Sequence, residues 1–173
     1  MSDPIWKPNA TVAVVVERDG RYLLVEELTP DGVRYNQPAG HLDHGESLLQ
    51  AAVREALEET GCRVWPTALV GIYQWSPSGK GELTYLRFAY AAELVDGAPQ
   101  PAGLVIRSRR HAGEDQAHET PADLDEGILR ALWLSYDEVL ACRDRHRSPL
   151  VLQCLDDYRA GRRYPLELIA HHD

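Results

Sequence analysis

The sequence predicts a mixed α+β fold, with one helix placed among strands and two further helices towards the C-terminus. Short apolar, β-branched runs separated by turn residues occupy the chain up to residue 37, which is typical of strands. A helical periodicity replaces them over residues 47–60, and strand-like runs return before two segments that open on helix-capping residues. Because strands and helices do not alternate regularly, this order indicates an α+β layout rather than repeated βαβ units.

The composition is typical of a soluble globular protein, and we expect a single domain over residues 1–173. The chain is 44% hydrophobic and 26% charged, and its length suffices to bury a core. No apolar run approaches the roughly 18 residues that a spanning helix needs. The N-terminus has neither the basic region nor the cleavage site of a signal peptide. We therefore expect a cytoplasmic protein.

The formal net charge of -9 disfavours partners that are bound through a polyanionic backbone. We expect no nucleic-acid polymer and no membrane as partner, whereas a small anionic substrate remains compatible if a divalent cation carries the attraction. The three cysteines, Cys62, Cys142 and Cys154, have no metal-binding spacing, and their odd number argues against a disulfide framework. We expect buried or idle thiols, and a monomer or weak homodimer.

The first half of the chain predicts three strands and a helix. Residues 11–16 and 22–25 are apolar runs joined by a turn at 18–20, which predicts a β-hairpin, and 33–37 predict a short strand that ends before a loop. Residues 47–60 predict a helix that ends at Gly61, where a left-handed stop favours glycine. At 100° per residue, a stripe about 100° wide gathers the side chains that we expect to face the core: Leu49, Val53, Ala56 and Leu57.

The second half predicts paired strands over 69–75 and 83–92 and another strand over 128–134. Between them, residues 97–125 form a long irregular excursion, which we expect to be mobile because such loops are usually functional or disordered. A capping box over 135–138 opens one helix, and Ser148 with Pro149 opens another that ends near Gly161.

Glu55, Glu58 and Glu59 stand at i, i+3 and i+4 of the predicted helix and share one face, which we expect to lie opposite the apolar stripe. Carboxylates crowded within one turn repel one another, and a bound hard cation would offset that cost. Carboxylate oxygens are the ligands that Mg²⁺ and Mn²⁺ prefer. A solvated acidic face is the alternative that these residues alone leave open.

The segment 40–62 resembles the Nudix signature without a gap. That signature reads glycine, five residues, glutamate, seven residues, arginine and glutamate, then an apolar residue, any residue, two glutamates, any residue, glycine and an apolar residue. The matching positions are Gly40, Glu46, Arg54, Glu55, Ala56, Glu58, Glu59, Gly61 and Cys62. The resemblance implies the Nudix α/β/α sandwich, with a mixed sheet, the signature as a loop-helix-loop beside it, and two C-terminal helices.

The resemblance also implies roles. Mg²⁺, with Mn²⁺ able to substitute, would be held by the carbonyl of Gly40 and the carboxylates of Glu55, Glu58 and Glu59. Glu46 and Arg54 would pair with each other or with the glutamates and hold the loop in shape. A glutamate would deprotonate the attacking water. We favour Glu55, with Glu126 as a distant candidate that is equally well explained as a surface charge.

Further stretches, at 36–42, 74–75, 86–88, 147–151 and 163–167, resemble the bacterial NudJ-type phosphatases. That resemblance implies hydrolysis of nucleoside tri- and diphosphates, hydroxymethylpyrimidine diphosphate and thiamine diphosphate, with release of inorganic phosphate. The excursion at 97–125 is longer than expected in that subgroup. Alternatives are a Nudix pyrophosphatase for ADP-ribose or a dinucleoside polyphosphate, and a non-catalytic ligand-sensing regulator, which would be expected to lack some signature glutamates.

The candidate substrate contacts are Gln37, Tyr73, Trp75 and Arg87. Tyr73 and Trp75 either stack on a planar ring of the substrate or pack in the core. Arg87 either holds a phosphate or pairs with a carboxylate on a neighbouring strand. The basic residues at 143, 145 and 147 predict a solvated turn rather than a site.

Overall fold

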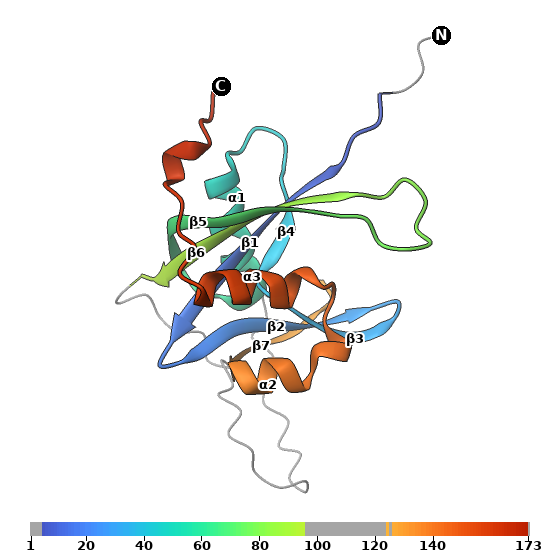
Figure 1. The fold of residues 1–173 in the computed structure, drawn as a ribbon, viewed down its shortest axis with the longest axis vertical. Coiled ribbons are helices and arrows are strands. Elements are labelled where there is room, and N and C mark those ends of the chain that lie inside the picture. Colours follow the sequence, from blue (N-terminus) through green and yellow to red (C-terminus); the bar gives the residue numbers. More distant parts are fainter. Residues whose placement is uncertain (1–4, 96–123, 125, 173) are drawn as a thin grey trace, which may run out of the picture.

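The computed structural model describes residues 5–95, 124 and 126–172, and Figure 1 shows their arrangement. The strands are β1 (Asn9–Arg18), β2 (Arg21–Thr29), β3 (Gly32–Asn36), β4 (Ala39–His41), β5 (Val64–Trp75), β6 (Tyr85–Leu94) and β7 (Ile128–Ser135). The helices are α1 (Leu48–Thr60), α2 (Tyr136–Ala141) and α3 (Leu150–Arg159), with short 3₁₀ turns η1 (Arg143–Arg145) and η2 (Leu166–Leu168). This order confirms the mixed α+β prediction. The excursion predicted over 97–125 lies, apart from Leu124, outside the described residues.

The predicted hairpin is formed by β1 and β2, which pair antiparallel with Arg18 opposite Arg21. The two residues between them, Asp19 and Gly20, both have positive φ, at 52° and 72°. Two successive positive φ values are what a two-residue turn needs to match the twist of the flanking strands. Aspartate and glycine are among the few residues that tolerate this backbone, so the turn chemistry fixes the hairpin locally.

β1 is the strand on which the two halves of the sheet meet. It lies between β4 and β6, and β5 extends that half beyond β6. In the other half, β2 pairs with β3 and with β7. Even-numbered residues of β1 such as Val12 enter one hydrophobic cluster, and odd-numbered ones such as Ala13 enter the other. Its unbroken apolar run therefore reflects burial on both faces.

Helices cover both faces of the sheet, as Figure 1 shows, with α1 behind it and α2 and α3 in front. Ala52 of α1 packs in the cluster that contains Val12, whereas Val139 of α2 and Leu155 of α3 pack in the cluster that contains Ala13. The expected α/β/α sandwich and its two C-terminal helices are thus confirmed. Among the described helices, none has the length and apolar character to cross a bilayer.

The predicted core face of α1 is confirmed for Ala56, which is fully buried, but wrong for Leu57. Leu57, assigned to the core stripe, is 42% exposed, and Leu49 and Val53 are only partly buried. The helix instead turns its alanines and its glutamates inward, so that the buried side chains are Ala51, Ala52, Glu55, Ala56, Glu59 and Thr60. Small side chains let the helix approach the sheet closely, and the carboxylates beside them find polar partners on β4 and Arg54. Side-chain hydropathy alone therefore includes the exposed Leu57 in the core face and leaves out the buried Glu55 and Glu59.

The helix ends agree with the sequence predictions. Gly61 closes α1 in the left-handed conformation, with φ 68°, and its N–H donates to the carbonyl of Leu57. Ser135 and Glu138 form the expected capping box of α2. Before α3, the Ser148 hydroxyl accepts from the N–H of Leu150. The three cysteines are buried and free, as expected.

Candidate active site

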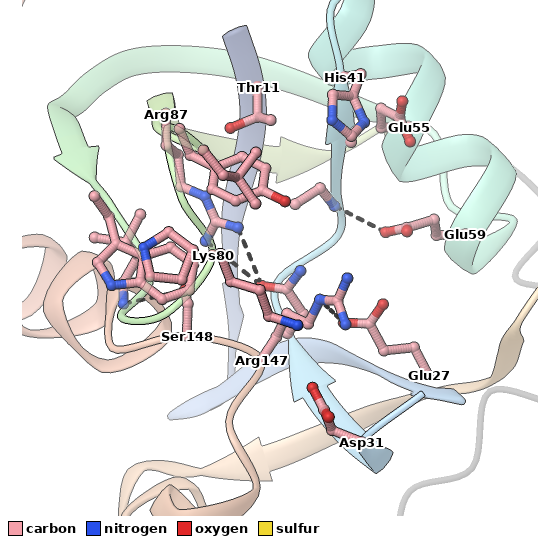
Figure 2. A pocket seen from close by; sticks show the side chains of 18 of the residues that line it. Thr11, Glu27, Asp31, His41, Glu55, Glu59, Lys80, Arg87, Arg147 and Ser148 are labelled. Atoms are coloured by element: carbon pink, nitrogen blue, oxygen red, sulfur yellow. Dashed lines mark hydrogen bonds and ion pairs between the residues drawn. The ribbon is translucent and has the colours of Figure 1, made fainter. Parts of the chain in front are cut away.

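A cavity of about 570 Å³ opens where the hydrophobic row along one face of β1 ends (Figure 2). Its wall combines residues of the signature segment with residues from both halves of the sheet and from the loop before α3. The signature contributes Gly40, His41, Glu55 and Glu59. The remaining wall includes Thr11, Glu27, Asp31, Asn36, Trp75, Lys80, Tyr85, Arg87, Arg147 and Ser148.

Strand register explains why these side chains meet. Thr11 on β1 lies opposite His41 on β4 and opposite Arg87 on β6, so the three side chains project from the same face of the sheet. Two residues further along β1, Ala13 lies opposite Ala39 in the same way and belongs to the apolar core. This face of the sheet is thus apolar at Ala13 and polar at Thr11, two residues away, and the cavity begins at Thr11.

Gly40 and the carboxyl group of Glu55 are so close together that only glycine fits at position 40. A Cβ atom at Gly40 would lie 2.1 Å from both Cδ and Oε1 of Glu55, far inside van der Waals contact. Glu59 is anchored beside it, because its Oε2 accepts a hydrogen bond of 2.8 Å from the backbone N–H of Ala39. Both carboxyl groups are largely buried, at 7% exposure for each residue. The two glutamates therefore reach the cavity wall along the backbone of β4.

Arg54 links the loop to the helix. Its Nε and Nη2 donate to the two oxygens of Glu46 at 3.0 and 2.6 Å, and its Nη1 donates to Glu55 at 2.8 Å and to Glu58 at 2.9 Å. A further bond of 3.0 Å reaches the carbonyl of His41. The hydrogen bonds with Glu46 raise the pKa of Arg54, and those with Arg54 lower the pKa of Glu46. Arg54 contacts the residues that the sequence analysis named for it.

The donor chemistry at this wall suits a hard divalent cation. Carboxylates at Glu55 and Glu59 and the carbonyl of Gly40 are oxygen ligands of the type that Mg²⁺ and Mn²⁺ take. Glu58 does not line the cavity, since its carboxylate faces Arg54 and its side chain is 41% exposed. Within the described part of the chain, no three His, Cys, Asp or Glu side chains are grouped as a complete metal site. A third carboxylate ligand would thus require Glu58 to turn away from Arg54.

Arg87 is a buried cation held by neutral partners. It is 7% exposed, and its guanidinium donates to Oδ1 of Asn36 at 3.4 and 3.5 Å and to Oε1 of Gln37 at 3.5 Å. Its Nε has no hydrogen-bond partner, and no carboxylate of the described residues forms an ion pair with it. The expected alternative, pairing with a carboxylate on a neighbouring strand, is not observed. Arg87 interacts electrostatically with Glu27, which lines the same cavity, but has no direct ion pair among the described residues, and a buried cation held in this way favours an anion in the cavity.

Gln37, expected to contact substrate, lies behind the wall instead. It is fully buried and absent from the cavity lining, and its Nε2 donates to the carbonyl of Val151 at 2.6 Å. This bond to α3 turns Oε1 of Gln37 towards Arg87. Gln37 directly follows the last residue of β3, so its amide bonds α3, while Asn36 at the end of the strand lines the cavity.

The two candidate aromatic residues have different surroundings. Trp75 lines the cavity and stacks on Tyr85, with ring centroids 5.7 Å apart and planes at 17°. Tyr73 does not line the cavity, and its hydroxyl donates to Oδ2 of Asp157 at 2.9 Å on α3. Its ring packs against the core, and burial raises its pKa. Both rings pack against the same hydrophobic cluster, so Tyr73 follows the packing alternative, whereas Trp75 packs there and also lines the cavity.

Four charged residues of the cavity were missed by the sequence analysis: Glu27, Asp31, Lys80 and Arg147. Arg147, expected in a solvated turn, lines the cavity with its Nε 3.7 Å from Oε1 of Glu27 (Figure 2). Its position follows from a backbone bond of 2.8 Å to the carbonyl of Tyr35, which ties the loop before α3 to β3. Burial raises the pKa of Glu27. Glu126, the distant base candidate, is exposed and does not line the cavity.

Comparison with known proteins agrees with this arrangement. The family model described as NUDIX domain matches residues 6–153. The chain is 36% identical over 165 residues to Phosphatase NudJ of Escherichia coli strain K12, covering 95% of this chain and 92% of that protein. A NUDIX hydrolase from Nitrosomonas europaea has a similar structure, with a TM-score of 0.79 and 44% identity over 96% of this chain and 98% of the other.

A second NUDIX hydrolase from Nitrosomonas europaea shares the fold at a TM-score of 0.64 and 18% identity, covering 94% of this chain and 78% of the other. The resemblance expected from the signature is therefore confirmed by matches that extend far beyond it. The chain belongs to the Nudix family and is a Nudix hydrolase.

Proposed function

We propose that this enzyme is a Mg²⁺-dependent hydrolase of phosphate anhydride bonds in small organic di- and triphosphates, and that it releases inorganic phosphate. The observation that carries the proposal is the cavity, whose wall includes Glu55, Glu59 and the buried Arg87, which forms no direct ion pair with any carboxylate of the described residues. The relative named Phosphatase NudJ supports the release of phosphate. Candidate substrates are nucleoside tri- and diphosphates, hydroxymethylpyrimidine diphosphate and thiamine diphosphate.

The carbonyl of Gly40 and the carboxylates of Glu55, Glu58 and Glu59 would hold the cation, with Mn²⁺ able to substitute. Such a cation neutralises anhydride oxygens and favours ionisation of water, which is the largest help available to attack on an anionic phosphate. Nudix hydrolases generally use a divalent metal, and the oxygen donors at this wall fit Mg²⁺.

The protein's own side chains supply the remaining steps. Glu55 accepts the proton of the attacking water, a role for which its burial against Gly40 fixes the carboxyl group. Arg87 donates to phosphate oxygens through the guanidinium edge that Asn36 and Gln37 orient. Trp75 offers its ring to the organic part of the substrate. Glu126 is the alternative base.

We also propose the setting of this activity. The chain acts as one Nudix domain over residues 1–173, as a monomer or weak homodimer in the cytoplasm, on small molecules rather than nucleic-acid polymers or membranes. The free, buried cysteines agree with a reducing compartment. Size-exclusion chromatography with light scattering across a range of protein concentrations tests the oligomeric state.

Two other functions compete. A Nudix pyrophosphatase for ADP-ribose or a dinucleoside polyphosphate would use the same glutamates and differ in its products. A ligand-sensing regulator without catalysis would belong to another class, and it is disfavoured because Glu55, Glu58 and Glu59 are all present. A substrate panel separates these possibilities by the products that appear.

The test is hydrolysis of the candidate di- and triphosphates with Mg²⁺, followed by ³¹P NMR of the products. Release of inorganic phosphate from a terminal anhydride is expected, and Arg87→Ala should lower kcat/KM by about 10²-fold because a charge-assisted phosphate contact is lost. Leu57→Ala, an exposed position on α1, is the control and should retain wild-type rates. Release of AMP and ribose 5-phosphate from ADP-ribose, with no free phosphate from any candidate substrate, would refute the proposed specificity.

A further inference from the structure

Unsatisfied polar atoms concentrate at the cavity. Among the described residues, the buried side-chain polar atoms without a hydrogen-bond partner are Oγ1 of Thr11, Oε1 of Glu27 and Nε of Arg87. All three residues line the same cavity. Leaving a buried polar atom unpaired is costly, and proteins accept that cost where a ligand completes the hydrogen bonds. The three atoms therefore mark a part of the cavity that is built to receive polar groups.

Glu27 is the acidic member of this set. It lies on β2 and lines the same cavity as Thr11 and Arg87, and the positive charges of Arg147 and Arg87 both act on its carboxylate. Its side chain is only 18% exposed, and the nearest cation, Nε of Arg147, is 3.7 Å away, beyond hydrogen-bond distance. Oε1 of Glu27 is therefore a hydrogen-bond acceptor at the cavity that no donor of the described residues occupies.

Charge decides which part of a substrate can lie beside Glu27. The phosphates are drawn to Arg87 and repelled by a carboxylate, so the group next to Glu27 belongs to the organic part and must offer N–H or O–H donors. An amino group on an aromatic ring is a donor only, whereas a hydroxyl also presents lone pairs to the carboxylate oxygens. Trp75 and Tyr85, which line the same cavity, offer a flat surface for such a ring.

We propose that Glu27 determines specificity by accepting a hydrogen bond from an amino group on a nitrogen heterocycle of the substrate. This inference rests on the phosphate hydrolysis proposed above and names the substrate class of that site. Glu27 takes no part in the chemical step, so its removal changes which diphosphate or triphosphate is preferred rather than whether hydrolysis occurs.

The experiment compares substrates that differ by one amino group. The pairs are cytidine triphosphate with its 4-deamino analogue, pyrimidin-2-one riboside triphosphate, and adenosine triphosphate with purine riboside triphosphate. In the wild-type enzyme, kcat/KM should favour the amino member of at least one pair by about 10- to 100-fold, as expected for a hydrogen bond to a charged group. Glu27→Leu, which removes the acceptor, should bring that ratio to within about threefold of unity.

Two further variants serve as controls. Glu27→Gln keeps the side-chain volume and one acceptor oxygen, so its ratio should fall between those of the wild type and Glu27→Leu, and it serves if the leucine variant fails to fold. Glu93→Gln neutralises an exposed carboxylate on β6 that does not line the cavity and should leave the ratio unchanged. Equal rates within both pairs for the wild type, or a preference that survives in both Glu27 variants, would overturn the inference. If no di- or triphosphate is hydrolysed with Mg²⁺, the proposed function fails instead.

Discussion

Replacing Gly40 by alanine should inactivate the enzyme while leaving it folded. The added Cβ would lie 2.1 Å from Cδ of Glu55, whereas ordinary contacts between carbon atoms are about 3.5 Å or longer. The carboxyl group must therefore move by roughly 1.5 Å. A displacement of about 1 Å at a reacting group can cost on the order of 10²-fold in rate, so we expect kcat to fall by about 10²- to 10³-fold.

Stability should change much less than the rate. The clash falls on the far end of a side chain that can rotate, and Gly40 lies in β4 without a positive φ, so alanine is compatible with its backbone. The loss of one hydrogen bond between Arg54 and Glu55 would cost about 1–2 kcal/mol. Thermal denaturation followed by circular dichroism should show a fall in Tm of only a few degrees.

A double-mutant cycle tests whether the effect passes through Glu55. Glu55→Ala removes the group that the new Cβ strikes, so the double variant Gly40→Ala/Glu55→Ala should be about as active as Glu55→Ala alone. Phosphate release at saturating substrate and Mg²⁺ provides the measurement. Wild-type kcat in Gly40→Ala, or full additivity in the cycle, would show that contact between Gly40 and Glu55 does not position the catalytic group.

Three further predictions concern the metal, the base and the pH dependence of stability. Excess EDTA should abolish turnover, and Mg²⁺ or Mn²⁺ should restore it. Glu59→Gln should lower kcat by about 10²-fold or more. Undiminished turnover in excess EDTA would contradict the metal assignment. Glu55→Gln should lower kcat by about 10²- to 10⁴-fold at every Mg²⁺ concentration, whereas Glu126→Gln should leave kcat nearly unchanged. If a Mg²⁺ titration instead shows the large loss of kcat for Glu126→Gln, Glu126 is the general base. Because Arg54 lowers the pKa of Glu46 from its ordinary 4.5, the stabilisation by this pair is complete above that pH and is lost as the pH falls through the lower folded-state pKa. Urea denaturation between pH 6 and pH 3 should thus show a steeper acid loss for the wild type than for Glu46→Gln, and parallel curves would contradict the coupling.

Local chemistry made much of the fold predictable. The positive φ values at Asp19 and Gly20, the left-handed stop at Gly61 and the capping box at Ser135 depend on residues within a few positions of one another. Spacing within the signature likewise brought Glu55 and Glu59 near each other on one helix, whatever that helix packs against. These features were recovered because hydrogen bonds and backbone preferences over short range specify them.

Packing across the molecule determined the rest. The inward face of α1 was only partly predicted, because Leu57 is more hydrophobic than Ala52, although the small alanine allows close approach to the sheet. Residues far apart in the chain, such as Glu27 and Arg147, meet only after the loop before α3 has joined β3.

Packing across the molecule also determined which strand residues line the cavity. Periodicity shows that neighbouring residues of a strand face opposite sides, but it does not show which side becomes a cavity. Gln37 was therefore placed in the site and Asn36 overlooked, and Thr11 became visible only through its register with Arg87. The sequence by itself determined the family signature and the local elements; the tertiary structure decided which faces are buried, because burial depends on every surface that packs against a strand or helix and not on its own residues alone.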